Sequence, residues 1–289
     1  ICTCLVGSEM CIRDSTHSYI LFFTDQGKCY WVKVYDIPEG GRAAKGRAIV
    51  NLIGCEPDEK VSAFISVKEF NEDHYVVMAT EKGMVKKTKL SAYSNPRKKG
   101  IYAVEIRDGD KLIEARVSTG DNDILLGTRN GKSIRFSEEQ IRASGRKTMG
   151  VKGITLSSED DRLVGMLLIK REGTVLVATE KGFGKRTEIS QYRAQKRGGK
   201  GVLTMKTTDK VGKMVTIKEV VDKDDLMIIT NQGVLIRLPV AQIRSIGRAT
   251  QGVKLIKLGE GTLVSSITRI MSEEEEDENN NTESTETKE

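Results

Sequence analysis

The feature that most constrains this chain is a repeat of about 50 residues, marked by two series of glycines. A four-residue segment, Thr-x-x-Gly, recurs five times, and its glycines are 56, 48, 51 and 51 residues apart: Gly27, Gly83, Gly131, Gly182 and Gly233. A second glycine follows each of these by 17 or 19 residues: Gly46, Gly100, Gly150, Gly201 and Gly252. Repeats of this length are typical of arrays whose units stack and share a core.

Each Thr-x-x-Gly segment lies between two β-like runs. In the last repeat, Leu-Met-Ile-Ile at 226–229 precedes Gly233, and Leu-Ile-Arg-Leu at 235–238 follows it. Glycine supplies the positive φ of a tight turn, so the pattern predicts a β-hairpin. Two more β-like runs follow each second glycine, such as 253–256 and 264–267. The sequence therefore predicts an all-β, propeller-like array of four-stranded blades, with one short helical turn at Ser137–Gln140.

Composition sets the domain limits. With 38% apolar residues the chain is too apolar to be disordered throughout, and no apolar run approaches the roughly 18 residues of a membrane helix. Residues 16–271 contain the repeats without a linker, so we expect them to form one domain. Residues 272–289 are rich in Glu, Asn and Thr and predict a disordered acidic tail. Residues 1–15 share none of the pattern and resemble a cloning or sequencing scar.

The net charge of +6 conceals a strong division along the chain. The segment 272–289 contains nine acidic residues and one basic residue, so the remainder of the chain carries +14. A strongly basic body predicts a polyanionic partner, and an acidic tail predicts a competitor for the same surface.

The bases gather around the second glycines, where each loop carries at least two. The candidate phosphate-binding residues in these loops are Arg42, Lys45, Arg47, Arg97, Lys98, Lys99, Arg146, Lys147, Lys152, Gln195, Lys196, Arg197, Gly198, Gly199, Lys200, Gly201, Arg248 and Lys254. Four further candidates lie four residues after a first glycine: Lys87, Arg135, Arg186 and Arg237. Equivalent positions of a radial repeat share one rim, so we expect a positive band that follows a phosphate backbone. No aromatic residues alternate with the bases, which argues against stacking on single strands.

One of these loops carries a family resemblance. Gln195-Lys196-Arg197-Gly198-Gly199-Lys200-Gly201 resembles the gyrase A box, Q-[RK]-R-G-G-K-G, and residues 22–52 and 247–253 are similar to other parts of the same family. Over about residues 17–271 the chain thus resembles the C-terminal domain of gyrase A. The resemblance implies a six-bladed β-pinwheel that binds and bends duplex DNA around its edge and supports ATP-dependent negative supercoiling.

The resemblance also implies partners and a location. The partners are duplex DNA and, in the intact enzyme, the rest of gyrase A and the ATPase component, gyrase B; the location is the bacterial cytoplasm, at the nucleoid and not at a membrane. The family's main box precedes the stretch matching Tyr19–Phe22 and is absent here, so we expect an incomplete first blade. The catalytic tyrosine belongs to the missing part, so we expect no catalytic residue, metal or cofactor in this chain.

Three other interpretations compete with this one. An enzyme in its own right has little support, because His17 and His74 lack a second ligand or paired carboxylate nearby in sequence, and Gly127–Ser133 has three residues between its glycines where a phosphate-binding loop needs four. A propeller that binds proteins predicts aromatic or mixed-sign loops. The C-terminal domain of topoisomerase IV has similar repeats, but the box and the acidic tail favour gyrase.

Overall fold

The computed structural model describes residues 18–38, 48–95, 97, 99–170 and 173–270. The described residues from Ser18 to Lys170, together with Arg193–Val202, form one compact unit, here the N-terminal unit. The other, the C-terminal unit, contains residues 173–192 and those from Leu203 onward. The leader 1–15 and the tail 272–289 lie outside the described residues, so the predictions made for them stay predictions.

The Thr-x-x-Gly segments form the predicted hairpin turns. All five glycines have positive φ, between 76° and 82°. The threonine explains the rest of the motif, because in four of the five segments its hydroxyl accepts the N–H four residues later, as Thr80 Oγ1 does from Met84 at 3.2 Å. Gly127–Ser133 is one of these hairpins, between two strands. The prediction of an all-β fold is therefore confirmed.

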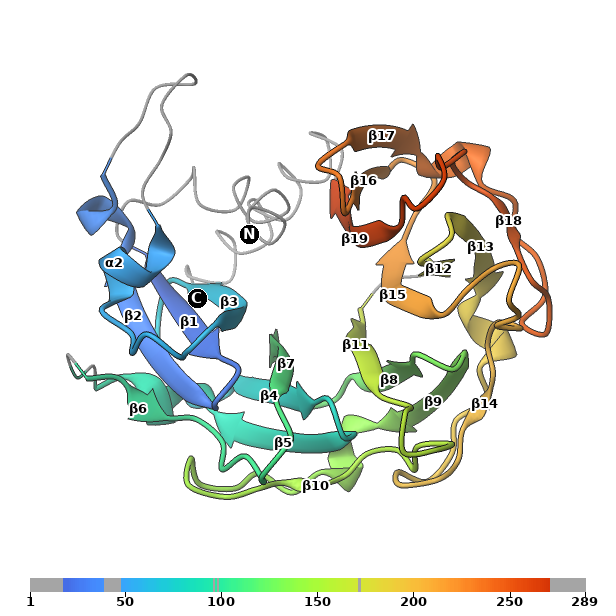
Figure 1. Ribbon diagram of the computed structural model, residues 1–289. Coiled ribbons are helices and arrows are strands. Elements are labelled where there is room, and N and C mark those ends of the chain that lie inside the picture. The colour runs from blue at the N-terminus through green and yellow to red at the C-terminus, as the bar shows by residue number, and fades with distance from the viewer. Residues whose placement is uncertain (1–17, 39–47, 96, 98, 171–172, 271–289) are drawn as a thin grey trace. The chain divides into compact units, whose positions relative to one another are not determined.

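The described residues form five antiparallel sheets, four with four strands and one with three (Figure 1). In the order in which the strands pair, the first sheet is β3 (Val61–Val67), β1 (Tyr19–Thr24), β2 (Lys28–Lys33) and β6 (Ile101–Tyr102), and the second is β7 (Leu112–Ser118), β4 (Tyr75–Thr80), β5 (Met84–Lys89) and β10 (Val151–Lys152). The third is β11 (Leu163–Ile169), β8 (Asp123–Thr128), β9 (Lys132–Ser137) and β14 (Val202–Leu203), and the fourth is β15 (Met214–Val220), β12 (Thr174–Thr179), β13 (Phe183–Glu188) and β18 (Val253–Lys254). The fifth is β19 (Val264–Ile270), β16 (Asp225–Thr230) and β17 (Leu235–Pro239).

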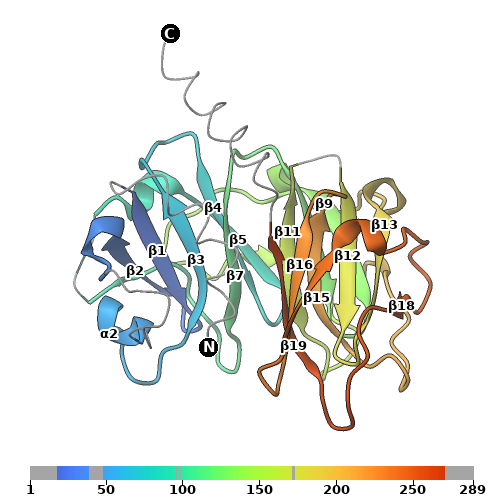
Figure 2. The same ribbon diagram turned by 90° about the horizontal axis from the view of Figure 1, so that it is seen from above.

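The outer strand of each four-stranded sheet comes from the next repeat along the chain. For example, β18 follows the hairpin of the fifth sheet in sequence but pairs with β13 of the fourth, at Phe183 and Gly184 (Figure 2). Each repeat thus forms four strands, as expected, but gives one of them to its predecessor.

This pairing of strands from successive repeats contradicts two expectations. The six-bladed fold is wrong, because the described residues form five blades. The expectation of an incomplete first blade is also wrong, because that sheet has four strands and the three-stranded sheet is the last. In the first four sheets the fourth strand comes from the next repeat, and no described residue follows Ile270. Within the last sheet, β17 accordingly leaves Leu235 52% exposed.

Short helical segments connect several of the strands. They are η2 (Val34–Asp36), α2 (Ile49–Ile53), η3 (Leu90–Tyr93), η4 (Glu138–Gln140), η5 (Ile189–Gln191) and η6 (Val240–Gln242). The turn predicted at Ser137–Gln140 is confirmed as η4, and the Ser137 hydroxyl caps it by accepting the Glu139 N–H at 3.2 Å. The sequence pattern did not predict α2.

Each unit has apolar cores of its own between neighbouring sheets. In the N-terminal unit, Leu21, Phe23 and Val76 belong to one core cluster, and Ile124, Leu126 and Val77 belong to a second. In the C-terminal unit, Leu176 and Ile228 belong to a third. Stacking of sheets thus buries faces that a single sheet would leave in water. Within the described part of the chain, no helix is both long and apolar enough to cross a membrane.

Candidate nucleic-acid interface

The second glycines let each basic loop lie directly on a strand of the preceding sheet. Gly150 and Gly201 have φ of 82° and 69°, in the left-handed region that favours glycine. A Cβ on Gly150 would lie 2.4 Å from the Val85 carbonyl oxygen, and one on Gly201 would lie 2.4 Å from that of Ser133. The phasing of the second glycines therefore follows from a backbone contact that recurs from sheet to sheet.

A repeated hydrogen bond joins three of the basic loops to the segment that follows the previous second glycine. In the N-terminal unit, Glu105 N donates to Thr148 O at 3.1 Å, and Thr155 N donates to Gly199 O at 2.9 Å. In the C-terminal unit, Lys206 N donates to Thr250 O at 3.0 Å. The three bonds are equivalent, because each donor lies five residues after a second glycine and each acceptor lies two residues before the next one. Successive loops of the N-terminal unit therefore form a continuous backbone track.

In the loop that resembles the box, some residues bond to neighbouring segments of the protein and others are exposed to solvent. Arg197 donates from Nε to Gln140 O at 3.0 Å and from Nη1 to Lys152 O at 3.2 Å, so its guanidinium joins two neighbouring segments. Gly198 has φ of 79° and donates its N–H to Gly153 O at 2.6 Å. Gln195 is half-buried, and its N–H bonds to Arg135 O at 2.8 Å.

Other candidate bases remain accessible to solvent. The exposed ones are Arg97, Lys99, Lys147, Lys152, Lys196, Lys200 and Lys254, and the half-buried ones, besides Arg197, are Arg146 and Arg248. Arg42, Lys45, Arg47 and Lys98 lie outside the described residues. Long basic side chains with exposed heads suit contact with phosphates, which need charge and reach more than fixed geometry.

The four bases that follow the first glycines are paired with carboxylates. The pairs are Lys87 with Glu138, Arg135 with Asp123, Arg186 with Asp222, and Arg237 with Asp225. The side chain of Lys87 is 8% exposed, whereas that of Arg237 is 65% exposed. A base whose charge is already balanced by a carboxylate attracts phosphate less strongly than an unpaired one.

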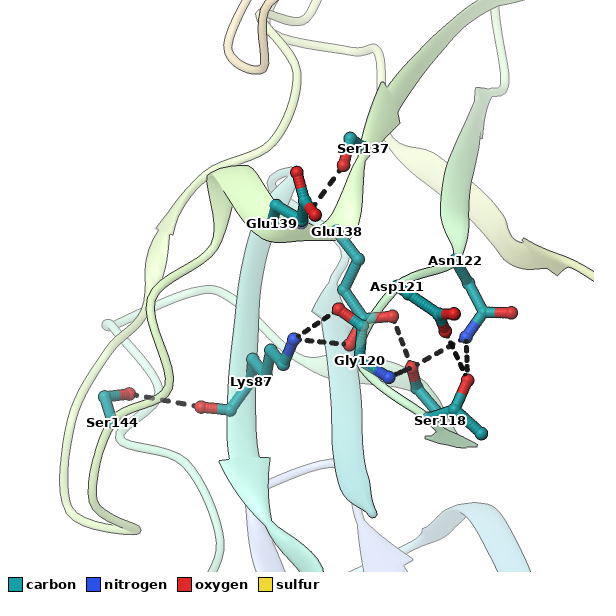
Figure 3. Close-up of polar contacts among 10 residues, drawn as sticks. Lys87, Ser118, Gly120, Asp121, Asn122, Ser137, Glu138, Glu139 and Ser144 are labelled. Carbon is teal, nitrogen blue, oxygen red and sulfur yellow. Dashed lines mark hydrogen bonds and ion pairs between the residues drawn. The ribbon is translucent and has the colours of Figure 1, made fainter. Parts of the chain in front are cut away.

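The Lys87 pair is part of a buried network (Figure 3). Its ammonium lies 2.9 Å from Glu138 Oε1, donates to Gly120 O at 2.9 Å, and lies 4.2 Å from the centre of the Tyr75 ring. The Ser118 hydroxyl donates to the other oxygen of Glu138. The Lys87 ammonium is thus satisfied by internal partners, while its backbone carbonyl accepts the N–H of Ser144, which lies just before a basic loop, at 2.9 Å.

Two sets of bases in the structure were not among the predicted residues. Arg142, Arg193 and Arg244 each lie eight residues before a second glycine, and all three are exposed. Their common phase was visible in the sequence and could have identified them.

Two buried lysines, Lys86 and Lys185, form the second set, three residues after a first glycine and 1% and 0% exposed. Lys86 donates to the carbonyls of Ala103, at 2.7 Å, and Arg146. Burial, and then the Arg146 charge, lower the pKa of Lys86 to about 7; burial, and then the Arg248 charge, lower the pKa of Lys185 to about 8. The spacing of the bases in the sequence did not indicate that Lys86 and Lys185 are buried.

Comparison with solved structures shows the fold. The chain superposes on the C-terminal domain of a DNA topoisomerase IV with a TM-score of 0.82 at 26% identity, covering 89% of this chain and 80% of the other. It superposes on a DNA gyrase A C-terminal domain with a TM-score of 0.78 at 22% identity, covering 89% of this chain and 84% of the other.

Comparison of sequences shows the family. The model of the DNA gyrase C-terminal domain, described as a β-propeller, matches five segments: 18–68, 74–119, 122–170, 173–220 and 224–270. DNA gyrase A of Staphylococcus epidermidis is 45% identical over 266 residues, and that of Staphylococcus aureus is 44% identical over 276 residues. These matches cover 91% and 94% of this chain but only 30% and 31% of the relatives. The chain therefore belongs to the family of DNA gyrase C-terminal domains.

Proposed function

We propose that this chain is the part of a DNA gyrase A protein that binds duplex DNA along its basic loops and bends it, without a catalytic residue of its own. The DNA-binding role follows from the family. The observation that carries the proposal for these residues is the hydrogen-bonded series of loops, which displays bases such as Lys147 and Lys200 once per repeat along a common backbone track. A regular series of positive charges along one track suits contact with the phosphate backbone, which is independent of base sequence.

The intact enzyme extends this proposal. We expect the chain to act within gyrase, joined to the rest of gyrase A and assembled with the ATPase component, gyrase B, where bending supports ATP-dependent negative supercoiling. The curated relatives, which are bacterial and of which this chain spans about 30%, support that context. We place the protein in the bacterial cytoplasm, at the nucleoid, because its DNA ligand is there.

Two sets of bases have different roles in this proposal. The loop bases that are exposed or half-buried contact phosphate, together with those of the loops outside the described residues. The bases paired with carboxylates, such as Arg135 and Arg186, add to the positive potential, and Arg186 also donates to Ile243 O at 2.7 Å, just before a basic loop. Removing an exposed base is therefore expected to reduce the number of phosphates neutralised, while removing a paired base changes the stability of the fold.

A salt titration tests the proposal. The dissociation constant for a labelled 40-base-pair duplex is measured between about 50 and 300 mM KCl. Its logarithm should rise with the logarithm of the salt concentration, with a slope of about 0.9 for each phosphate neutralised. We expect a slope that corresponds to several phosphates, with little preference among duplexes of different sequence. Lys196→Gln/Lys200→Gln should lower the slope by about two, whereas the matched pair Lys60→Gln/Lys111→Gln, on exposed lysines away from the second glycines, should leave it unchanged.

The outcomes separate the alternatives. Binding that does not depend on salt, or no binding at low salt, would overturn the proposal. A topology assay, in which nicked plasmid is resealed in the presence of the chain, separates wrapping from simple binding: a shift in linking number supports bending around the protein. Unchanged topology with tight binding would leave only the binding role.

A further inference from the structure

Lys86 on β5 and Lys185 on β13 occupy equivalent places in two sheets, and neither is needed for the contacts proposed above. Each is buried and directs its ammonium into the underside of a basic loop. Lys185 donates to Gly247 O at 2.7 Å, to Arg248 O and to Thr250 Oγ1 at 3.0 Å. Lys86 holds Arg146 O in the equivalent loop. In both cases an ammonium meets backbone carbonyls of the residues that precede a second glycine.

The two residues that follow Lys185 bind the backbone just before the same loop. In the sequence, Lys86-Lys87-Thr88 and Lys185-Arg186-Thr187 are matching triplets. Arg186 Nε donates to Ile243 O at 2.7 Å, and Thr187 Oγ1 donates to Ile246 O at 2.8 Å. Arg186 and Thr187 thus bind the backbone just before the loop, and Lys185 binds the loop itself.

In the third sheet, the basic loop is bound without a lysine at this position. There the equivalent residue is Ile134, whose Cδ1 would lie 3.3 Å from a Cβ on Gly199. The guanidinium of Arg197 supplies the bonds that hold the loop. The loops of Arg146 and Arg248, which lack a pair of adjacent glycines, are held by a buried ammonium instead.

We propose that Lys86 and Lys185 are positioning residues for DNA binding, which orient two basic loops by binding their carbonyls on the inner side so that bases of these loops face outward. The inference rests on the proposed function. Neither ammonium contacts the DNA directly in this arrangement, since both are covered by the loops that they hold. An ammonium has three donors, so it can collect several carbonyls that would otherwise repel one another.

The strength of the hydrogen bonds from these lysines to the loop carbonyls depends on whether the lysines are protonated. Arg146 and Glu105 are the charged groups that act on Lys86, and Arg248 acts on Lys185. Because burial brings the pKa values to about 7 and 8, the ammonium groups lose their protons over a range in which the exposed loop bases stay charged. A neutral amine donates one bond fewer and carries no charge, so DNA binding should weaken between pH 7 and pH 9.

The test compares Lys86→Met/Lys185→Met with the matched variant Lys82→Met/Lys181→Met. The control lysines lie in the same hairpins and also donate to loop carbonyls, Lys82 to Asp108 O at 3.1 Å and Lys181 to Asp209 O, but these loops are not the basic ones. Both variants therefore remove two lysines, but the control removes two ammonium–carbonyl hydrogen bonds and Lys86→Met/Lys185→Met removes five. Methionine fills a buried site without a charge, so the fold should survive.

We expect the Lys86→Met/Lys185→Met variant to bind the duplex about tenfold more weakly, and the control about twofold at most. The dissociation constant of the unmodified chain should rise from pH 7 to pH 9, and that of the Lys86→Met/Lys185→Met variant should stay flat. Equal losses in the two variants would show that only net charge matters and would overturn the inference.

Amide hydrogen exchange gives a readout that does not need DNA. Release of the loops should speed exchange at Glu105 and Lys206, whose N–H groups donate to Thr148 O and Thr250 O. Unchanged protection at both amides in the Lys86→Met/Lys185→Met variant would also overturn the inference. If the unmodified chain fails to bind DNA while the two amides lose protection in the variant, the proposed function fails and the loop-holding role survives.

Discussion

The Lys87 ammonium lies 2.9 Å from Glu138 Oε1, and both side chains are buried. The pair joins β5 of one repeat to η4 of the next, and the Lys87 carbonyl holds Ser144 at the start of a basic loop (Figure 3). A base that sequence phase assigned to phosphate contact therefore has a partner inside the N-terminal unit.

Breaking this buried pair should be costly for stability. Glu138→Gln leaves the Lys87 charge buried without its counter-ion, so we expect unfolding to become easier by about 3–5 kcal/mol, measured by urea denaturation. Glu139→Gln, on the exposed neighbour in η4, is the control and should change stability by less than about 0.5 kcal/mol. A small effect of Glu138→Gln would show that the pair is solvated in solution.

The backbone contact at Gly201 should not tolerate a side chain. A Cβ there would lie 2.4 Å from Ser133 O, and φ is 69°, so Gly201→Ala should cost about 1–3 kcal/mol in free energy of unfolding. Gly145→Ala is the matched control in a basic loop, because its Cβ would meet nothing within 4 Å and its φ is not positive. Thermal unfolding of both variants tests the contact, and equal melting temperatures would contradict it.

Stability should rise with pH above neutrality. The pKa values of Lys86 and Lys185 are lowered to about 7 and 8 in the fold, from the ordinary lysine value of 10.5, so the unfolded chain binds more protons between these limits. The free energy of unfolding should therefore increase by up to about 1.4 kcal/mol per pH unit for each lysine until about pH 10.

Urea midpoints at pH 6.5, 8 and 9.5 measure this dependence. The Lys86→Met/Lys185→Met variant should show a flatter profile, because the two groups that release protons on folding are absent. A variant profile as steep as that of the unmodified chain would assign the dependence to other groups. Stability and DNA affinity are thus expected to change in opposite directions as pH rises.

The phased arginines extend the proposed track. Replacing Arg142, Arg193 and Arg244 together by Gln should reduce the salt slope of duplex binding by about two to three. Lys60→Gln/Lys111→Gln/Lys210→Gln removes the same number of exposed charges elsewhere and should leave the slope unchanged. A similar reduction in both variants would mean that the slope reports net charge and not position.

The acidic tail should compete with DNA for the basic loops. Residues 272–289 carry nine acidic residues and one basic residue, so their removal raises the net charge from +6 to +14. We expect the truncated chain to bind a duplex more tightly at low salt, with the difference shrinking as salt screens the charges. Replacing the acidic residues of this segment by Gln should act like its removal. Unchanged affinity in both variants would contradict the competition.

The sequence by itself determined the local structure. A glycine at each Thr-x-x-Gly turn needs a positive φ, and alternating apolar residues need a sheet face, so the hairpins and the all-β class followed from residues close together in the chain. The second glycines also identified the basic loops, because in each repeat the bases lie around the second glycine.

Only the tertiary structure decided how these parts meet. The exchange of β18 into the sheet of β13 depends on pairing between residues about 70 positions apart, which local pattern does not report. The same holds for the bases: Lys147 is exposed, whereas Lys86 and Lys87 are buried by loops from the next repeat. Basic residues look alike in a sequence, and the distant segments that pack around each one decide whether its charge meets solvent, a carboxylate or a backbone carbonyl.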